Sequence, residues 1–144
     1  RTVNITKKEP VLDGETVQYS SHFMIQDTLA YDFEREQNFS YRNLTHEQKA
    51  LHVMAFSADI WQVHPFREGN TRTVAVFGIQ YLRKLGFHID NSLFSEHAAY
   101  FRNSLVFYHH HGEKQDKHFL KIFFENLLLG KKNVLLDEDM YAKE

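Results

Sequence analysis

Six residues suited to phosphate chemistry fall within nine consecutive positions, between two apolar stretches of the chain. They are His64, Arg67, Glu68, Gly69, Asn70 and Arg72. A connection between two helices needs only a capping residue and a glycine, so this set indicates a further use. The use that fits all of its members is the transfer of a phosphate-containing group.

Each member has a physical role around a phosphate chain. His64 titrates near neutral pH and can accept a proton from an attacking hydroxyl. Glu68 can hold Mg²⁺, which proteins usually bind through one or two carboxylates together with substrate phosphates. Gly69 and Asn70 precede a predicted helix, whose first amides and dipole favour an anion. Arg72 supplies a planar fork that matches phosphate oxygens.

Taken singly, these residues have simpler interpretations. A lone histidine at a helix end is usually a surface or capping residue, and Glu-Gly-Asn is usually a turn. The ordered set before a helix start favours the functional interpretation. Two aromatic neighbours, Trp61 and Phe66, are predicted to be core residues, with Phe66 anchoring the loop.

The elements that must position this stretch are predicted to be mainly helical, because the chain has only 2 Pro and 6 Gly. Asp13-Gly14 predicts a β-hairpin over about residues 9–20. Thr45 and Gln48 form a capping-box pattern at the start of a helix that runs to Val63. Further helices are predicted over 73–85, 95–108 and 114–129, with Gly130 closing the last. The helical core is placed at about 21–130 and a loose tail at 131–144.

Composition limits the alternatives. The 144 residues fit one domain, over 1–144, and their formal charge of −2 gives no global attraction to nucleic acid. Without Cys the chain has no disulfides and no thiolate metal site. No apolar run is long enough to cross a bilayer. His109, His110 and His111 cannot all face one point on a helix, so a solvated helix end is predicted there.

The motif resembles that of the Fic family, His-x-Phe-x-(Asp/Glu)-Gly-Asn-(Gly/Lys)-Arg-x-x-Arg. The matching residues are His64, Phe66, Glu68, Gly69, Asn70 and Arg72. The resemblance extends to the stretches Tyr100–Leu105 and Phe124–Gly130, so residues 9–130 are judged to be covered. It implies a helical bundle with a small β-hairpin flap, in a bacterial cytoplasmic enzyme.

The resemblance implies transfer of AMP from ATP to a Ser, Thr or Tyr hydroxyl of a target protein. By position, His64 would be the general base and Glu68 the Mg²⁺ ligand. Gly69, Asn70 and the Thr71 backbone would bind the phosphates, together with Arg72. The flap would align the target by strand addition. Its residues would be Val11, Leu12, Thr16, Val17, Gln18 and Tyr19.

Two positions depart from the family pattern. Thr71 stands where the family has Gly or Lys, and Ala75 where it has a second Arg. These departures leave other donors open, namely UMP, phosphocholine or a single phosphate, and also a silent binding or toxin–antitoxin module. An inhibitory antitoxin or a segment outside this chain, and a homodimer, also remain open. Glu96 follows Ser92 at the spacing of the family's inhibitory motif but lacks its last element, so we expect a helix start there.

Overall fold

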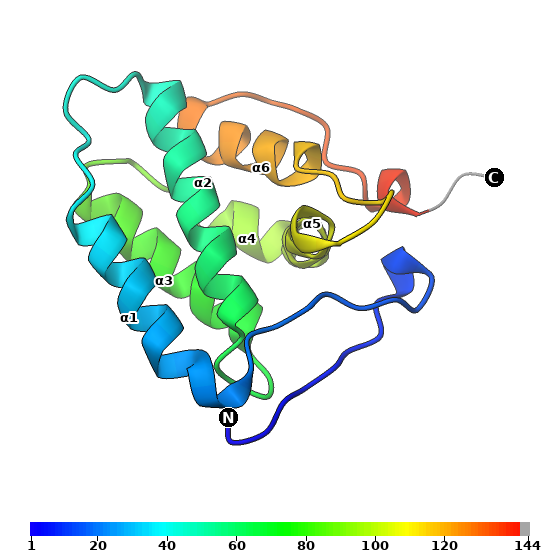
Figure 1. Ribbon diagram of the computed structural model, residues 1–144. Coiled ribbons are helices and arrows are strands. Elements are labelled where there is room, and N and C mark those ends of the chain that lie inside the picture. Colours follow the sequence, from blue (N-terminus) through cyan, green and yellow to red (C-terminus); the bar gives the residue numbers. More distant parts are fainter. Residues whose placement is uncertain (142–144) are drawn as a thin grey trace.

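The central element of the computed structural model, which describes residues 1–141, is helix α2, His46–Val63 (Figure 1). Helices α1, α3, α5 and α6 all pack against it. The other helices are α1 Ile25–Gln37, α3 Asn70–Lys84, α4 Ser92–Glu96, α5 Ala98–His109 and α6 His118–Leu129. Short 3₁₀ turns lie at η1 Pro10–Leu12, η2 His22–Met24 and η3 Asp137–Met140. Residues 1–141 contain no strand, so the mainly α prediction is confirmed.

The predicted start of α2 and the predicted end of α6 are confirmed by their caps. Gln48 N–H donates to Thr45 Oγ1 at 3.1 Å, and Thr45 N–H donates to Gln48 Oε1 at 2.9 Å, which completes the capping box. Gly130 ends α6 with φ 65°, a left-handed conformation that glycine adopts without strain. These local signals therefore fix both helix ends without help from the rest of the fold.

Three predicted helices have other boundaries. Helix α3 begins three residues earlier than expected, at Asn70. The helix expected over 95–108 is divided at His97, whose φ of −125° is not helical, into α4 and α5. The start expected at Lys114 lies at His118, where Asp116 Oδ1 accepts from the backbone N–H at 2.8 Å. Side-chain capping by Asp116 thus competes with the helical pattern upstream of it.

The predicted β-hairpin over about 9–20 is wrong. Asp13 and Gly14 do take positive φ, 56° and 90°, as that turn requires. The arm before them coils into η1, because Pro10 cannot donate to a ladder and Val11 and Leu12 are buried in the core. The loop closes through Glu9, which donates from its backbone to Glu15 O at 2.9 Å.

The residues assigned to a target-docking flap therefore divide between core and surface. Val11, Leu12, Val17 and Tyr19 belong to the main hydrophobic core. Thr16 and Gln18 alternate with them and are exposed. The segment is extended, with Gln62 Nε2 of α2 donating to Gln18 O at 3.1 Å. Burial of every second side chain, rather than pairing with another strand, holds it in place.

A buried carboxylate joins three of the helices. Glu36 of α1 accepts from Tyr81 of α3 at 2.5 Å and from Tyr41. Its other oxygen lies 2.7 Å from Nε2 of His52 in α2. Burial and these hydrogen bonds to Glu36 raise the pKa of Tyr81 to about 12. Both carboxylate oxygens are thus satisfied, which allows a charged group to lie inside the bundle.

One prediction near the end of the chain is also wrong. His109 and His110 are buried rather than solvated, and His109 Nε2 lies 2.7 Å from Ala58 O of α2. Residues 131–141 of the tail predicted to be loose are mostly exposed; within them Met140 is buried, and Asn133 N–H donates to Asn126 Oδ1 at 2.8 Å. The rest of that tail, 142–144, lies outside the described residues. In the part that the structure describes, no helix is both long and apolar enough to cross a membrane.

Candidate active site

The residues predicted for catalysis lie where α2 ends and α3 begins. His64 is the C-cap of α2, with φ 53°, and its N–H donates to Trp61 O at 3.0 Å. Positive φ is uncommon outside glycine, although histidine is among the residues enriched there. The chain therefore reverses at His64 itself, which turns the imidazole back toward the interior instead of toward solvent.

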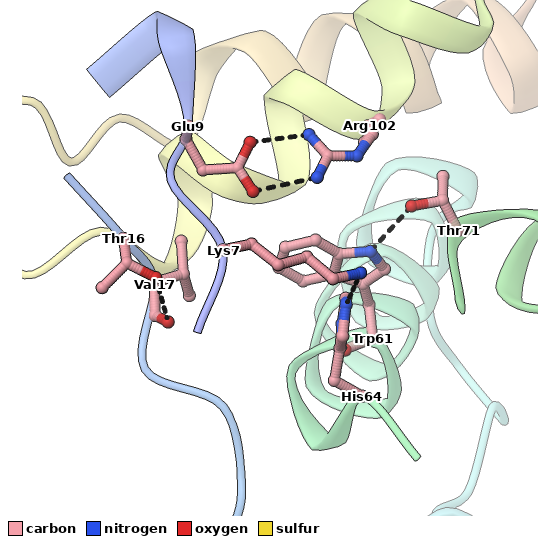
Figure 2. A network of polar contacts seen from close by, with 8 residues as sticks. All are labelled: Lys7, Glu9, Thr16, Val17, Trp61, His64, Thr71 and Arg102. Carbon is pink, nitrogen blue, oxygen red and sulfur yellow. Dashed lines mark hydrogen bonds and ion pairs between the residues drawn. The ribbon is translucent and has the colours of Figure 1, made fainter. Parts of the chain in front are cut away.

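The imidazole of His64 is enclosed on all sides, with only 1% of the residue exposed. Its ring stacks on Tyr19, with centroids 3.9 Å apart. Nδ1 lies 3.0 Å from Trp61 O, and Nε2 lies 3.1 Å from Lys7 Nζ (Figure 2). Because a carbonyl only accepts, Nδ1 carries the proton, and Nε2 is left with the lone pair.

Burial lowers the pKa of His64 to about 4. The hydrogen bond to Trp61 O opposes this shift, and the positive charges of Lys7, Arg1 and Arg102 add to it. The side chain is thus neutral at physiological pH, with its acceptor nitrogen toward Lys7. This is the form that a general base requires.

The start of α3 provides backbone donors next to this base. Gly69 is the N-cap, with φ 80°, and no side chain caps the helix. The first backbone amide bonded back along α3 is that of Thr73, which donates to Gly69 O at 2.9 Å. The amides of residues 69–72 therefore lack helical partners, as expected for a first turn, and suit an anion. A residue with a Cβ at position 69 would strain the backbone.

The side chain of Asn70 shapes the loop before the helix. Its Nδ2 donates to Phe66 O at 2.7 Å, and its Oδ1 accepts from Phe66 N–H at 2.9 Å. The predicted core anchor is wrong, because Phe66 is 49% exposed. Hydrogen bonds from buried Asn70 fix the loop in place of a buried ring. The side chain of Asn70 thus holds the loop, and its backbone N–H, in the first turn of α3, suits an anion.

Thr71 joins the two helices that flank the loop. Trp61 Nε1 at the end of α2 donates to Thr71 Oγ1 at 3.0 Å (Figure 2). Trp61 is fully buried, so its prediction as a core residue is confirmed. A buried indole N–H needs an acceptor, and the hydroxyl supplies it. Neither Gly nor Lys at this position would offer that acceptor, which explains the departure from the motif.

The charged residues of the motif point outward. Glu68, Arg67 and Arg72 are exposed and form no ion pair with the residues that the structure describes. Glu68 is close enough to Lys7 for its charge to act on the pKa of that amine. Within residues 1–141 no three acidic or histidine side chains converge as a metal site. One unpaired carboxylate beside an uncapped helix start nevertheless fits Mg²⁺ that is held mainly by phosphates.

Four further charged residues around His64 were missed by the sequence analysis, namely Lys7, Glu9, Arg102 and Arg1. Glu9 is 1% exposed and is bound by Arg102 through two hydrogen bonds, of 2.7 and 2.9 Å (Figure 2). The hydrogen bond to Glu9 raises the pKa of Arg102. This pair fixes the segment that carries Lys7. Glu9 and Arg102 lie 93 positions apart, and no local pattern in a single sequence predicts such a pair.

Comparison with protein families gives one match. A sequence model described as the Fic/DOC family matches residues 4–82, which is more than half of the chain and includes the whole motif. Comparisons with curated proteins and with solved structures return no match. The matched range begins before Lys7 and ends within α3, so it contains His64, the loop and the helix start described above. On this evidence the chain belongs to the Fic/DOC family.

Proposed function

We propose that this chain transfers AMP from ATP to a Ser, Thr or Tyr hydroxyl of a target protein. The observation that carries the proposal is the neutral imidazole of His64, held with Nε2 as its acceptor beside the uncapped start of α3. Family membership supports a transferase of this fold or a related module. AMP transfer is the specific reaction that the motif favours.

In the proposed reaction the donor's phosphates bind at the amides of residues 69–72 and at Arg72. Mg²⁺, held by Glu68 with phosphate oxygens, would neutralise charge on the phosphates. The target hydroxyl gives its proton to His64 Nε2, and its oxygen forms a bond to the α-phosphorus. The bond between that phosphorus and the bridging oxygen breaks, and pyrophosphate leaves. Fixed amides and charges stabilise the transition state without reorganisation.

The test is transfer of label from ATP labelled at the α-phosphate to proteins of a bacterial lysate, with Mg²⁺. We expect His64→Ala to reduce labelling about 10²–10⁴-fold, which is the usual contribution of a general base. His64→Asn is a second variant, because Asn tolerates the left-handed φ at this position. His88→Ala is the matched control, since His88 is exposed.

Undiminished labelling by both His64 variants would refute the mechanism. If the parent transfers label from UTP or CDP-choline and not from ATP, the proposed donor is wrong, and the proposed role of His64 as the base remains. If no donor gives label, the chain is a binding module.

A further inference from the structure

The ammonium group of Lys7 contacts Nε2 of His64, the nitrogen that a general base must keep available. Its Nζ lies 3.1 Å from Nε2 of His64, and an ammonium can only donate (Figure 2). Of the described residues, Lys7 alone brings a cationic group within hydrogen-bond distance of this ring. The lone pair of Nε2 is therefore already engaged, and a target hydroxyl cannot use it until Lys7 moves.

The segment that carries Lys7 is anchored on both sides of this residue, at Arg1 and at Glu9. Glu9 is fixed by Arg102, and Arg1 donates from Nε to His64 O at 2.6 Å. The lysine side chain is a compact charge on a flexible four-carbon stem. Its head group can thus change partners without displacement of the segment.

The charges around Lys7 show what a better partner would be. Burial and the charges of Arg102 and Arg1 lower its pKa, and those of Glu9 and Glu68 raise it. Lys7 forms no ion pair with a described residue, and both oxygens of Glu9 are taken by Arg102. Its present acceptor is a neutral imidazole. A phosphate oxygen is a better acceptor for this ammonium, because its negative charge adds Coulomb attraction that a neutral imidazole does not supply.

We propose that Lys7 is a phosphate-binding residue of this site: its ammonium covers Nε2 of His64 in the substrate-free chain and moves to a phosphate oxygen of the bound nucleotide, which exposes Nε2 to the attacking hydroxyl. The ligand class is a nucleoside triphosphate, so the inference rests on the proposed function. Ala75 replaces the second Arg of the family motif, so that position supplies no positive charge, and its side chain is partly buried against the core. Lys7 supplies positive charge to the site from outside the motif.

The experiment compares binding of ATP with Mg²⁺, by titration calorimetry, to the parent, Lys7→Met and Lys8→Met. Lys8 is the matched control, because it is exposed next to Lys7 and its replacement removes the same charge. We expect Lys7→Met to weaken ATP binding about tenfold or more, the effect of one hydrogen bond between charged groups. Lys8→Met should stay within about twofold of the parent, since an exposed charge contributes little. Adenosine, which has no phosphate, should bind the parent and Lys7→Met equally.

Two further readouts separate phosphate binding from a structural role. Lys7→Arg should recover most of the affinity for ATP, because it restores a cation. In NMR titrations without nucleotide, Lys7→Met should raise the pKa of His64, because a like charge next to the ring is removed. Circular dichroism of each variant establishes that it is folded.

The proposal is overturned if Lys7→Met binds ATP as tightly as the parent, or if neither binds ATP. Faster labelling by Lys7→Met would also overturn it and would make Lys7 only a cover over the base. These outcomes are distinct from failure of AMP transfer. Lys7-dependent ATP binding without any labelling would refute the proposed function and support the role of Lys7. Labelling that depends on His64 and not on Lys7 would support the proposed function and refute the role of Lys7.

Discussion

At the scale of single residues, the central observation is that the fold encloses the imidazole of His64 and keeps it neutral, as a general base requires. Burial lowers its pKa to about 4, and the Trp61 carbonyl selects the tautomer. The pH dependence of kcat/KM for a free enzyme reports the pKa of its essential base. We therefore expect the acidic limb of kcat/KM to lie well below pH 6.5, where an ordinary histidine titrates. Initial rates of labelling from pH 4.5 to 8 should therefore show no limb near 6.5, and a limb centred there would contradict the enclosed site.

Asn70 offers a second residue-scale prediction. Asn70→Ala removes both hydrogen bonds to the Phe66 backbone and leaves buried polar groups without partners. We expect a loss of about 1–3 kcal/mol in the free energy of unfolding, and weaker ATP binding because the loop loses its shape. Urea unfolding and calorimetry measure the two effects. Asn38→Ala, at an exposed position, should change stability by less than about 0.5 kcal/mol. Wild-type stability in Asn70→Ala would mean that the loop does not depend on this side chain.

The candidate residues that could be predicted from the sequence are those that form a local motif. His64, Gly69 and Asn70 stand together in the motif, and the structure brings them to one loop and one helix start. The sequence did not predict the partners supplied from a distance. Lys7 and Arg102 reach the site only through the folding of separate segments. Thr71 departs from the family motif, and spacing alone does not show that its hydroxyl accepts a hydrogen bond from the indole of Trp61.

At the scale of elements, the N-terminal segment is held to the bundle by a buried ion pair. Arg102→Ala would leave Glu9 charged and without a partner at 1% exposure. Removing one partner of a buried pair typically costs about 3–5 kcal/mol, and we expect a value near 3 because Arg102 is partly exposed. The control is Lys131→Ala, whose ion pair with Glu125 is near the surface and should contribute little to stability, because water screens it. Equal effects of the two variants in urea unfolding would show that the pair does not hold the segment.

Elements could be predicted from the sequence where their ends carry local signals. The capping box at Thr45 and the glycine at 130 placed α2 and α6 correctly at those ends. The hairpin failed although its turn residues were read correctly. Asp-Gly specifies a local reversal, but whether the arms pair depends on where their apolar residues are buried. Here Val11 and Leu12 are buried in the core within a 3₁₀ turn, so the two arms do not pair as strands.

At the scale of the whole molecule, two enclosed histidines make folding sensitive to acid. The pKa values of His64 and His109 are both lowered to about 4, mainly by burial. The unfolded chain, with histidine pKa values near 6.5, binds more protons than the folded one between pH 6.5 and 4. The free energy of unfolding therefore falls as pH falls through that window. We expect a loss of about 2 kcal/mol per histidine at pH 5.

The contribution of one histidine can be isolated. His109→Gln keeps a donor for Ala58 O and removes a titrating group. Its free energy of unfolding should depend less on pH than that of the parent, by about 2 kcal/mol between pH 7 and 5. Taking the difference between the two proteins cancels the carboxyl groups, including Asp59, whose raised pKa acts in the opposite direction. Parallel curves from urea unfolding would mean that His109 is not enclosed in the folded protein.

The overall class of the molecule could also be predicted, because few Gly and Pro and regular apolar spacing favour helices. The contacts of residues 131–141 could not, since they depend on Met140, which is buried, and on hydrogen bonds between Asn133 and Asn126. Local composition says little about such an attachment. The same holds for His109 and His110, which lie in a polar run yet are buried.

The most direct test of the central claim compares ATP labelled at the α-phosphate with ATP labelled at the γ-phosphate in one lysate, with parent and His64→Asn side by side. We predict label on protein from the α position only, and only with the parent. Label from the γ position alone would mean phosphate transfer, and equal labelling by His64→Asn would show that the enclosed histidine is not the base.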